Sequence, residues 1–475
     1  MLIRNAEIWG TGPGDVRIEG PRIASIGTLL PRSDEQVIDA RGGLLLPGLH
    51  DHHIHLAALA AQQSSISCGQ PDVLTSAQLA RALQAPGTGW LRGVGFHESV
   101  LDGVLPDAAM LDRMVADRPL RMQHRTGRMW LLNSRALEEL LAIADAPPGL
   151  ERAGGRFTGR LFEEDAWLSR TLGGSLPDFA QTSARLARCG VTGITDMSPR
   201  NDPGVARHFA QQRSDGRLLQ SSMIAGSLAL GEHLPPGCTL GPLKLHLHEN
   251  ALPDFDEAVA LVRSGHAQNR AVAVHCVTEV ELVFALAVLE VAGSVRGDRI
   301  EHVSVASPDL VSRMRDLGLS ACVQPHFIAE RGDRYLADVD PRHHADLYRL
   351  RSLAAASLPL AGGSDAPYGE ADPWKSMTAA VNRRAPSGAV IGADEGLTPE
   401  EALALYLTEP ADFSRQRAIA VGAMADLCLM DRPWSEVRAC LNKSDVRMVI
   451  AGGNLVHQRI DQSPLERLLR ADASA

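Results

Sequence analysis

The sequence predicts an α/β protein built on a (β/α)8 TIM-like barrel. From about residue 182 to residue 365, short apolar segments typical of strands alternate with amphipathic segments typical of helices. Repeated βα units of this kind assemble into a parallel sheet with helices packed around it. Histidine, lysine and aspartate residues stand at the ends of several of these strands, and a (β/α)8 barrel places its active site at that end.

Eight strand segments can be placed along the chain. The first, residues 49–55, follows an apolar run that begins at Leu44 and passes a Pro-Gly step. The other seven segments are residues 191–196, 218–224, 243–248, 272–275, 300–302, 320–325 and 360–365. Eight is the number of parallel strands that closes this kind of barrel.

The barrel region is longer than a barrel requires. A typical (β/α)8 barrel takes roughly 250 residues, and the segment 49–419 is considerably longer. The extra length is expected after the first strand, at about residues 65–180, where the sequence reads as helical and irregular with Gly-rich and Pro-rich patches. We therefore predict an insertion there.

Both ends of the chain are rich in β-forming residues. Residues 1–46 contain short strand-like segments separated by Gly and Pro, and residues 425–430 and 446–456 have the same character. A small N-terminal meander is marginally stable by itself. The C-terminal segments can supply the partner strands that it needs.

Composition excludes several classes of partner and points to the cytoplasm. A formal charge of -10, without a local run of Lys or Arg, argues against a nucleic-acid surface. No apolar run is long enough to cross a membrane, and the N-terminus does not resemble a signal peptide. The seven scattered cysteines fit reduced thiols. We expect a cytoplasmic protein, a homodimer, that acts on a small molecule.

The segment 47–55 gives the strongest chemical signal, because it contains Asp51, His53 and His55 at alternate positions. The period of two along a strand places these side chains on one face. Two neutral imidazoles side by side suit a borderline-soft divalent ion such as Zn²⁺. A pair of histidines on a half-exposed strand can equally be solvated surface, so the pair needs support from elsewhere in the chain.

That support comes from further blocks that, together with residues 47–55, resemble the amidohydrolase superfamily and its branch amidohydrolase family 3. The blocks are Arg-Ile-Glu-His at 299–302, Val-Gln-Pro at 323–325, Gly-Ser-Asp-Ala-Pro at 363–367 with Asp-Pro-Trp at 372–374, and Gly-Ala-Met-Ala-Asp at 422–426. The likeness extends from about residue 2 to about residue 458. It implies a metal-dependent hydrolase barrel over residues 49–419 and a small β-sandwich composed of residues 1–48 and 420–475.

The resemblance also implies a set of metal ligands at the strand ends. His53, His55 and Asp365 would bind one ion, and His275 and His302 a second ion. Lys244 would bridge the two ions, which requires a deprotonated amine that burial favours and its carboxylation by carbon dioxide. An ordinary lysine beside a single ion stays open as the alternative. We therefore predict one or two divalent ions, most simply Zn²⁺.

Two of these residues are also candidates for catalysis. Asp365 would pass a proton from water to the leaving nitrogen, and His302, or another residue of the pocket, would stabilise the oxyanion.

Three further residues are candidates for substrate binding: Arg128, His248 and His326. Arg128 stands where family members commonly have His, and a guanidinium suits a carboxylate. His246 and His248 form a second His-x-His, which could line the substrate pocket or help to bind metal, and we favour the pocket.

The predicted reaction is hydrolysis of a C–N amide-type bond, in an N-formyl or N-acyl small molecule, by hydroxide that the metal generates. A deaminase of an amino-heterocycle and a lactone or ester hydrolase are alternatives, because the same nucleophile attacks each of these electrophiles. A non-catalytic binding or regulatory barrel is a third alternative. Against it stands the complete ligand set, since a protein without catalysis would be free to lose members of it.

Overall fold

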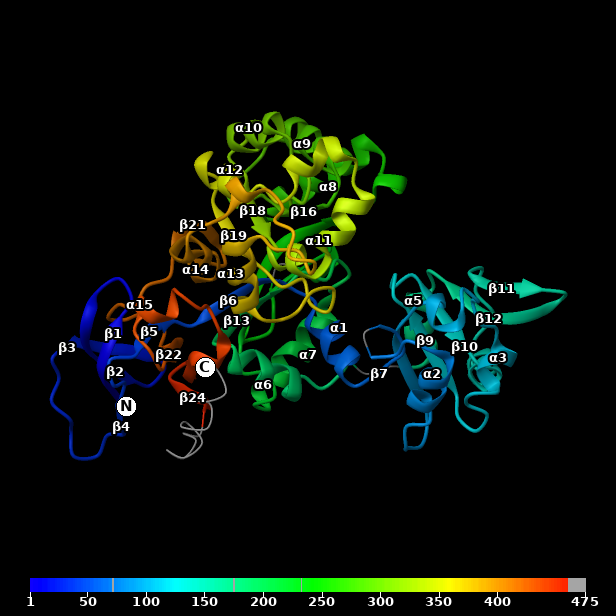
Figure 1. Cartoon of the computed structure of the whole chain (residues 1–475), viewed down its shortest axis with the longest axis horizontal. Helices are drawn as coiled ribbons and strands as arrows, with labels where there is room; N and C mark the ends of the chain where they lie inside the picture. Colours follow the sequence, from blue (N-terminus) through cyan, green and yellow to red (C-terminus); the bar gives the residue numbers. More distant parts are fainter. Residues whose placement is uncertain (71, 174–175, 232, 460–475) are drawn as a thin grey trace. The chain divides into compact units, whose positions relative to one another are not determined.

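The computed structural model describes residues 1–70, 72–173, 176–231 and 233–459. The chain divides into two compact units, of which one comprises Met1–Leu56 together with the residues from Asp178 onward, and the other comprises Ala57–Pro177. Each unit is described separately below (Figure 1). The second unit overlaps the predicted insertion, whereas the boundaries predicted for the domains stay predictions.

Eight parallel strands of the first unit form one sheet, and each strand pairs with the next along the chain. The strands are β6 (Leu49–Ile54), β13 (Val191–Asp196), β14 (Ser221–Gly226), β15 (Cys238–His246), β16 (Val272–Cys276), β17 (Arg299–His302), β18 (Ser320–Val323) and β19 (Leu360–Gly362). The residues after β19 bond back to β6, where the Asp365 N–H donates to the His53 carbonyl at 2.6 Å. The predicted barrel is confirmed.

Helices connect the barrel strands and lie around the sheet (Figure 1). They are α6 (Ala180–Arg188), α7 (Pro203–Ser214), α8 (Phe255–Ala267), α9 (Glu279–Ala292), α10 (Pro308–Asp316), α11 (His326–Asp338), α12 (Leu350–Ala355), α13 (Pro373–Asn382) and α14 (Pro399–Leu407). Thr398 caps α14, because its side chain accepts the Glu401 N–H while the Glu401 carboxylate accepts the Thr398 N–H. Within the described ranges, no helix has both the length and the apolar character needed to span a membrane.

The two ends of the chain share a second eight-stranded sheet, as their blue and orange-red strands in Figure 1 show. Its strands are β1 (Leu2–Ile8), β2 (Gly12–Glu19), β3 (Arg22–Gly27), β4 (Val37–Asp39), β5 (Leu44–Pro47), β22 (Leu427–Met430), β23 (Val446–Ala451) and β24 (Asn454–Gln458). The contact between the ends is the antiparallel pair β5–β22, and Leu45 and Leu427 are buried in the core of this sheet. A two-layer sandwich stays a prediction, and residues 460–475 of it lie outside the described residues.

Short elements complete the first unit: β20 (Thr408–Glu409), β21 (Asp412–Gln416) and α15 (Trp434–Val437). The helix α1 (Leu56–Gln63) begins at the last residue of the N-terminal part of this unit and continues into the second unit.

The second unit contains a six-stranded sheet, in a part of the chain that the sequence indicated to be helical and irregular. The strands are β7 (Ile66–Ser67), β8 (Leu91–Phe96), β9 (Leu120–His124), β10 (Met129–Leu132), β11 (Leu150–Ala153) and β12 (Arg156–Phe162). Four helices accompany them: α2 (Ser76–Leu83), α3 (Ala108–Asp112), α4 (Ser134–Leu141) and α5 (Asp165–Thr171). Arginines interrupt the apolar pattern of β8 and β9, and the guanidinium groups of Arg92 and Arg121 pack over the ring of Trp130. The interruptions explain why the pattern did not reveal the strands.

Candidate metal centre

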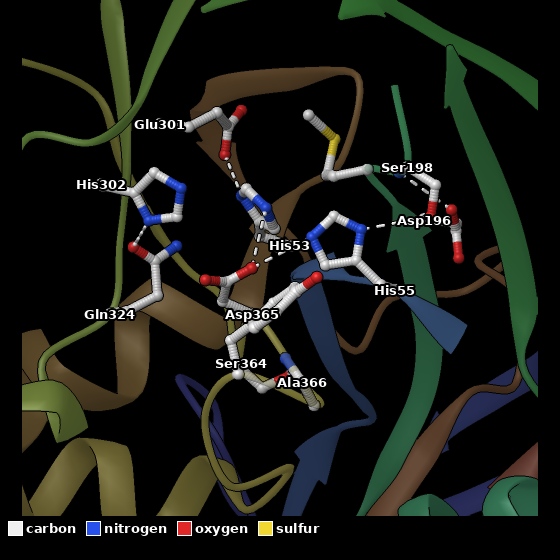
Figure 2. A network of polar contacts seen from close by, with 12 residues as sticks. His53, His55, Asp196, Ser198, Glu301, His302, Gln324, Ser364, Asp365 and Ala366 are labelled. Carbon is white, nitrogen blue, oxygen red and sulfur yellow. Dashed lines mark hydrogen bonds and ion pairs between the residues drawn. The ribbon is translucent and has the colours of Figure 1, made fainter. Parts of the chain in front are cut away.

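Three side chains at the ends of β6 and β19, the first and last strands of the barrel sheet, converge on one point. His53 from β6 and His55, directly after it, both point Nε2 at the Oδ1 atom of Asp365, at 3.3 and 3.1 Å (Figure 2). Asp365 follows β19, which is the strand that closes onto β6. The donor atoms of His53, His302 and Asp365 all lie within 4.8 Å of one another. This spacing places the three side chains in one candidate metal centre.

The backbone around Asp365 is docked onto β6 by Asp51. The Asp51 Oδ1 atom accepts the Ser364 N–H at 2.9 Å and the His53 N–H at 3.2 Å. Gly363 makes this close approach possible, since a Cβ there would lie 2.5 Å from the Cβ of His53. Asp365 has φ of 52°, in the left-handed region, where residues of functional sites are often held by their surroundings.

His302, at the end of β17, turns one ring nitrogen outward and leaves the other free. Its Nδ1 atom lies 2.8 Å from Oε1 of Gln324. Its Nε2 atom is buried and has no hydrogen-bond partner among the described residues. A buried polar atom without a partner costs free energy, so this atom fits an absent ligand such as a metal ion.

The side chain of Lys244 on β15 is buried in a similar way. Its Nζ atom is buried and has no hydrogen-bond partner within the described ranges. Burial lowers the pKa of this amine, although Glu301 and Asp365 act in the opposite direction. A depressed pKa favours the neutral amine, which is the form that carbon dioxide would modify.

Histidine rings from β15 and β16 lie against one another beside His302. The His275 ring meets the His302 ring edge-on, with the centroids 4.5 Å apart, and stacks on the His246 ring at 4.3 Å. His248 lies next to His246, with ring centroids 4.5 Å apart. Burial lowers the pKa of His246 and of His302 to about 3. These two imidazoles are therefore neutral near pH 7, which is the form that binds metal.

The negative charge of Asp365 suits a bound cation. Burial alone would raise the pKa of Asp365, but His53, His55 and His302 hold it well below its ordinary value. The site therefore presents an ionised carboxylate beside the imidazole nitrogens of His53, His55 and His302, and nitrogen and oxygen donors of this kind bind Zn²⁺. The residues present fit a divalent ion.

Comparison with known proteins agrees with this geometry. The chain matches the model of a family described as "Amidohydrolase family" over residues 36–457. This chain belongs to the amidohydrolase family. The amidohydrolase is similar to the N-substituted formamide deformylase of Arthrobacter pascens, with 25% identity over 88% of this chain and 90% of that protein. A putative amidohydrolase of Bacillus subtilis is 24% identical over 90% of this chain and 91% of its own.

Solved structures show the same fold. The structure of an uncharacterized metal-dependent hydrolase from Pyrococcus horikoshii superposes with a TM-score of 0.76 and 20% identity, and covers 94% of this chain and 99% of its own. The N-isopropylammelide isopropylaminohydrolase of Burkholderia multivorans gives a TM-score of 0.55 and 18% identity, with coverage of 96% and 98%. The predicted membership of amidohydrolase family 3 is confirmed.

The amidohydrolase contains a second group of His and Glu residues, in the other unit, that does not suit a metal. His97, Glu98 and His124 lie within ligand distance of one another. However, the backbone N–H of Ser99 donates to Nδ1 of His97, and the backbone N–H of Thr126 donates to Nδ1 of His124. A neutral ring that accepts at Nδ1 has its proton on Nε2, so both Nε2 atoms face Glu98 as donors and have no lone pair for an ion.

The three residues predicted to bind substrate lie in different surroundings. His248 lies in the histidine cluster beside His246. Arg128 belongs to the second unit and pairs with Glu163, with most of its side chain exposed. His326 is buried, and its two ring nitrogens already contact the Ser376 hydroxyl and the Ser364 carbonyl. This arrangement favours a role in holding the turn before Asp365 over the substrate contact that the sequence suggested.

Four polar residues that support the ligands were missed in the sequence. Glu301 contacts Nδ1 of His53 at 2.6 Å, and Gln324 contacts His302. Ser198 lies 3.1 Å from Nδ1 of His55, and Asp196 accepts the Ser198 N–H (Figure 2). Glu301 and Gln324 stand inside recognised blocks, and their position beside a ligand was the available signal.

Proposed function

We propose that this amidohydrolase cleaves the C–N bond of an N-formyl or N-acyl small molecule at a divalent metal centre, with Zn²⁺ as the ion. The convergence of His53, His55 and Asp365 is the observation that supports a catalytic metal. The formamide deformylase that the chain resembles supports the class of substrate.

We assign His53, His55 and Asp365 to one ion, and His275 and His302 to a second ion that Lys244 joins to the first when it is carboxylated. The Nε2 atom of His302 and the Nζ atom of Lys244 support this assignment, since both are buried and lack a hydrogen-bond partner among the residues that the structure describes. A bound divalent ion supplies Lewis-acid polarisation of the substrate carbonyl and activation of water.

The protein side chains then move the protons. The Asp365 carboxylate is ionised and faces the cluster, so it can accept a proton at a carboxylate oxygen and deliver it to the leaving nitrogen. Because the Nε2 lone pair of His302 is assigned to the metal, another residue of the pocket would stabilise charge on the carbonyl oxygen. A leaving amine requires this proton, because its anion is a poor leaving group.

We further propose that His248 contacts the substrate, whereas the selection of a carboxylate by Arg128 stays a prediction from the sequence. The protein would act as a homodimer in the cytoplasm. The seven cysteines support a reducing compartment, since all are free thiols and most are buried.

The test is a product assay on purified protein loaded with Zn²⁺ and bicarbonate. A panel of N-substituted formamides and N-acyl amines should release formate or another carboxylate together with the amine, and the Asp365→Asn variant should release neither. Release of ammonia from amino-heterocycles, or hydrolysis of lactones, without turnover of any amide would replace this proposal with the corresponding alternative.

A further inference from the structure

Two of the metal-binding imidazoles have outer partners of different charge. His53 has its Nδ1 atom 2.6 Å from the Glu301 carboxylate, and His302 has its Nδ1 atom 2.8 Å from the Gln324 amide oxygen. Each contact turns the Nε2 atom of the ring toward the candidate metal centre (Figure 2). The group that accepts at Nδ1 is a carboxylate for His53 and a neutral amide for His302.

Glu301 is ionised and rigidly held. Its other oxygen accepts from Nε of Arg299 at 2.6 Å, and both side chains are almost completely buried. Arg299 is fixed in turn, because it donates to the His52 carbonyl and lies over the ring of Phe413. Arg299 therefore keeps the carboxylate charged without leaving an unbalanced buried charge.

We propose that Glu301 is a positioning residue that makes the His53 position bind its metal ion more tightly than the His302 position. A carboxylate that accepts from Nδ1 fixes the proton there and makes Nε2 a more basic ligand, whereas a neutral amide fixes the ring with a weaker effect. Because Arg299 balances the charge of Glu301, the effect comes from the hydrogen bond on His53. This inference rests on the two-ion centre of the proposed function.

The inference predicts two unequal steps when metal-free protein is titrated with Zn²⁺ in bicarbonate against a chelator of known affinity. Glu301→Gln should weaken the tighter step by about 10–100-fold and leave the weaker step unchanged. As the matched control, Gln324→Met removes the outer acceptor of His302 and should weaken only the weaker step. His55→Ala should abolish the tighter step, and His275→Ala the weaker step, which assigns each step to its ligands.

Glu301→Gln leaves Arg299 buried beside a neutral group, and that could prevent folding. The double variant Arg299→Met with Glu301→Gln removes both buried charges and retains an amide at 301, so it should show the same selective loss. Circular dichroism of the metal-free proteins checks that each variant is folded, and Co²⁺ absorption spectra should change only for the ion at the altered position.

Three results would overturn the inference: a single binding step in the unaltered protein, an unchanged tighter step in the folded 301 variants, or equal weakening of both steps. These titrations contain no substrate, so they are independent of the assigned reaction. Unequal steps that respond as expected, in a protein that cleaves no amide, would refute the proposed substrate and leave the role of Glu301 standing.

Discussion

At the scale of single residues, Asp365 and Lys244 have the clearest separate roles. Asp365 belongs both to the proposed metal ligands and to the proposed path of the proton. Lys244 is the proposed bridge, because a buried ammonium would repel ions bound beside it whereas a carboxylated lysine would bind them. Each residue can therefore be removed with a distinct consequence.

We expect Asp365→Asn to lower kcat by at least about 10²–10⁴-fold, the usual contribution of positioned proton transfer. Asn tolerates the left-handed backbone that this position requires, so the thermal unfolding of the metal-free variant should stay close to that of the unaltered protein. Steady-state kinetics and a melting curve check both statements. Full activity of the variant would remove Asp365 from the mechanism.

Lys244→Ala should lower the metal content toward one ion per chain, because the bridge between the ions is lost. A short carboxylic acid added to the variant should restore part of the second ion and part of the activity, since it supplies the missing anionic oxygen. Elemental mass spectrometry measures the ion content with and without the acid. Metal content equal to that of the unaltered protein would show that Lys244 is no bridge.

At the scale of elements, the site depends on the contact between the turn after β19 and the strand β6. Asp51 binds the backbone of both, and Gly363 lets them approach. The ends of the chain meet in a comparable way through β5 and β22. In both cases, segments far apart in sequence are joined by backbone hydrogen bonds.

Gly363→Ala should damage this contact, because the added Cβ would lie 2.5 Å from the Cβ of His53 and 2.6 Å from its nitrogen. We expect a loss of roughly 1–3 kcal/mol in the free energy of unfolding and weaker metal binding. The control is Gly204→Ala in the first turn of α7, where the nearest atom would be a side-chain oxygen of Asp202 at 3.1 Å. Equal stability of the two variants in denaturant titrations would contradict the explanation.

At the scale of the whole molecule, buried neutral histidines make folding sensitive to acid. His50 and His52 are buried, and burial lowers the pKa of each well below its ordinary value. His50 contacts the Thr195 hydroxyl at 2.9 Å, whereas both ring nitrogens of His52 have no partner among the described residues. Protonation of either ring in the folded protein would place a charge in the core.

The free energy of unfolding should therefore fall as the pH decreases below about 6.5, the pKa of an unfolded histidine. The folded pKa values are lowered, so the unfolded chain binds more protons in this range and gains stability from acid. His52→Leu should reduce this slope and cost little at pH 7, since no hydrogen bond is lost. Urea titrations of the metal-free proteins at pH 5 and pH 7 measure the slope, and an unaltered slope in the variant would exclude His52 as a source.

The sequence by itself determined the barrel and its first strand, and it predicted the ligands that we propose. The reason is local: strand periodicity places Asp51, His53 and His55 on one face, and residues at strand ends gather at one end of a parallel barrel. Asp365 was predicted as a ligand because the block at residues 363–367 resembles amidohydrolase family 3.

Only the tertiary structure decided how the ligands are supported. Glu301 and His53 are 248 residues apart along the chain, and no local pattern states that β17 and β6 bring a carboxylate against an imidazole. The burial of His326 between Ser364 and Ser376 is likewise a product of packing. The sheet of the second unit was hidden because its strands are short and include partly buried arginines that pack on Trp130. Periodicity reports which face a side chain occupies, whereas its partner across the fold depends on how the elements close in space.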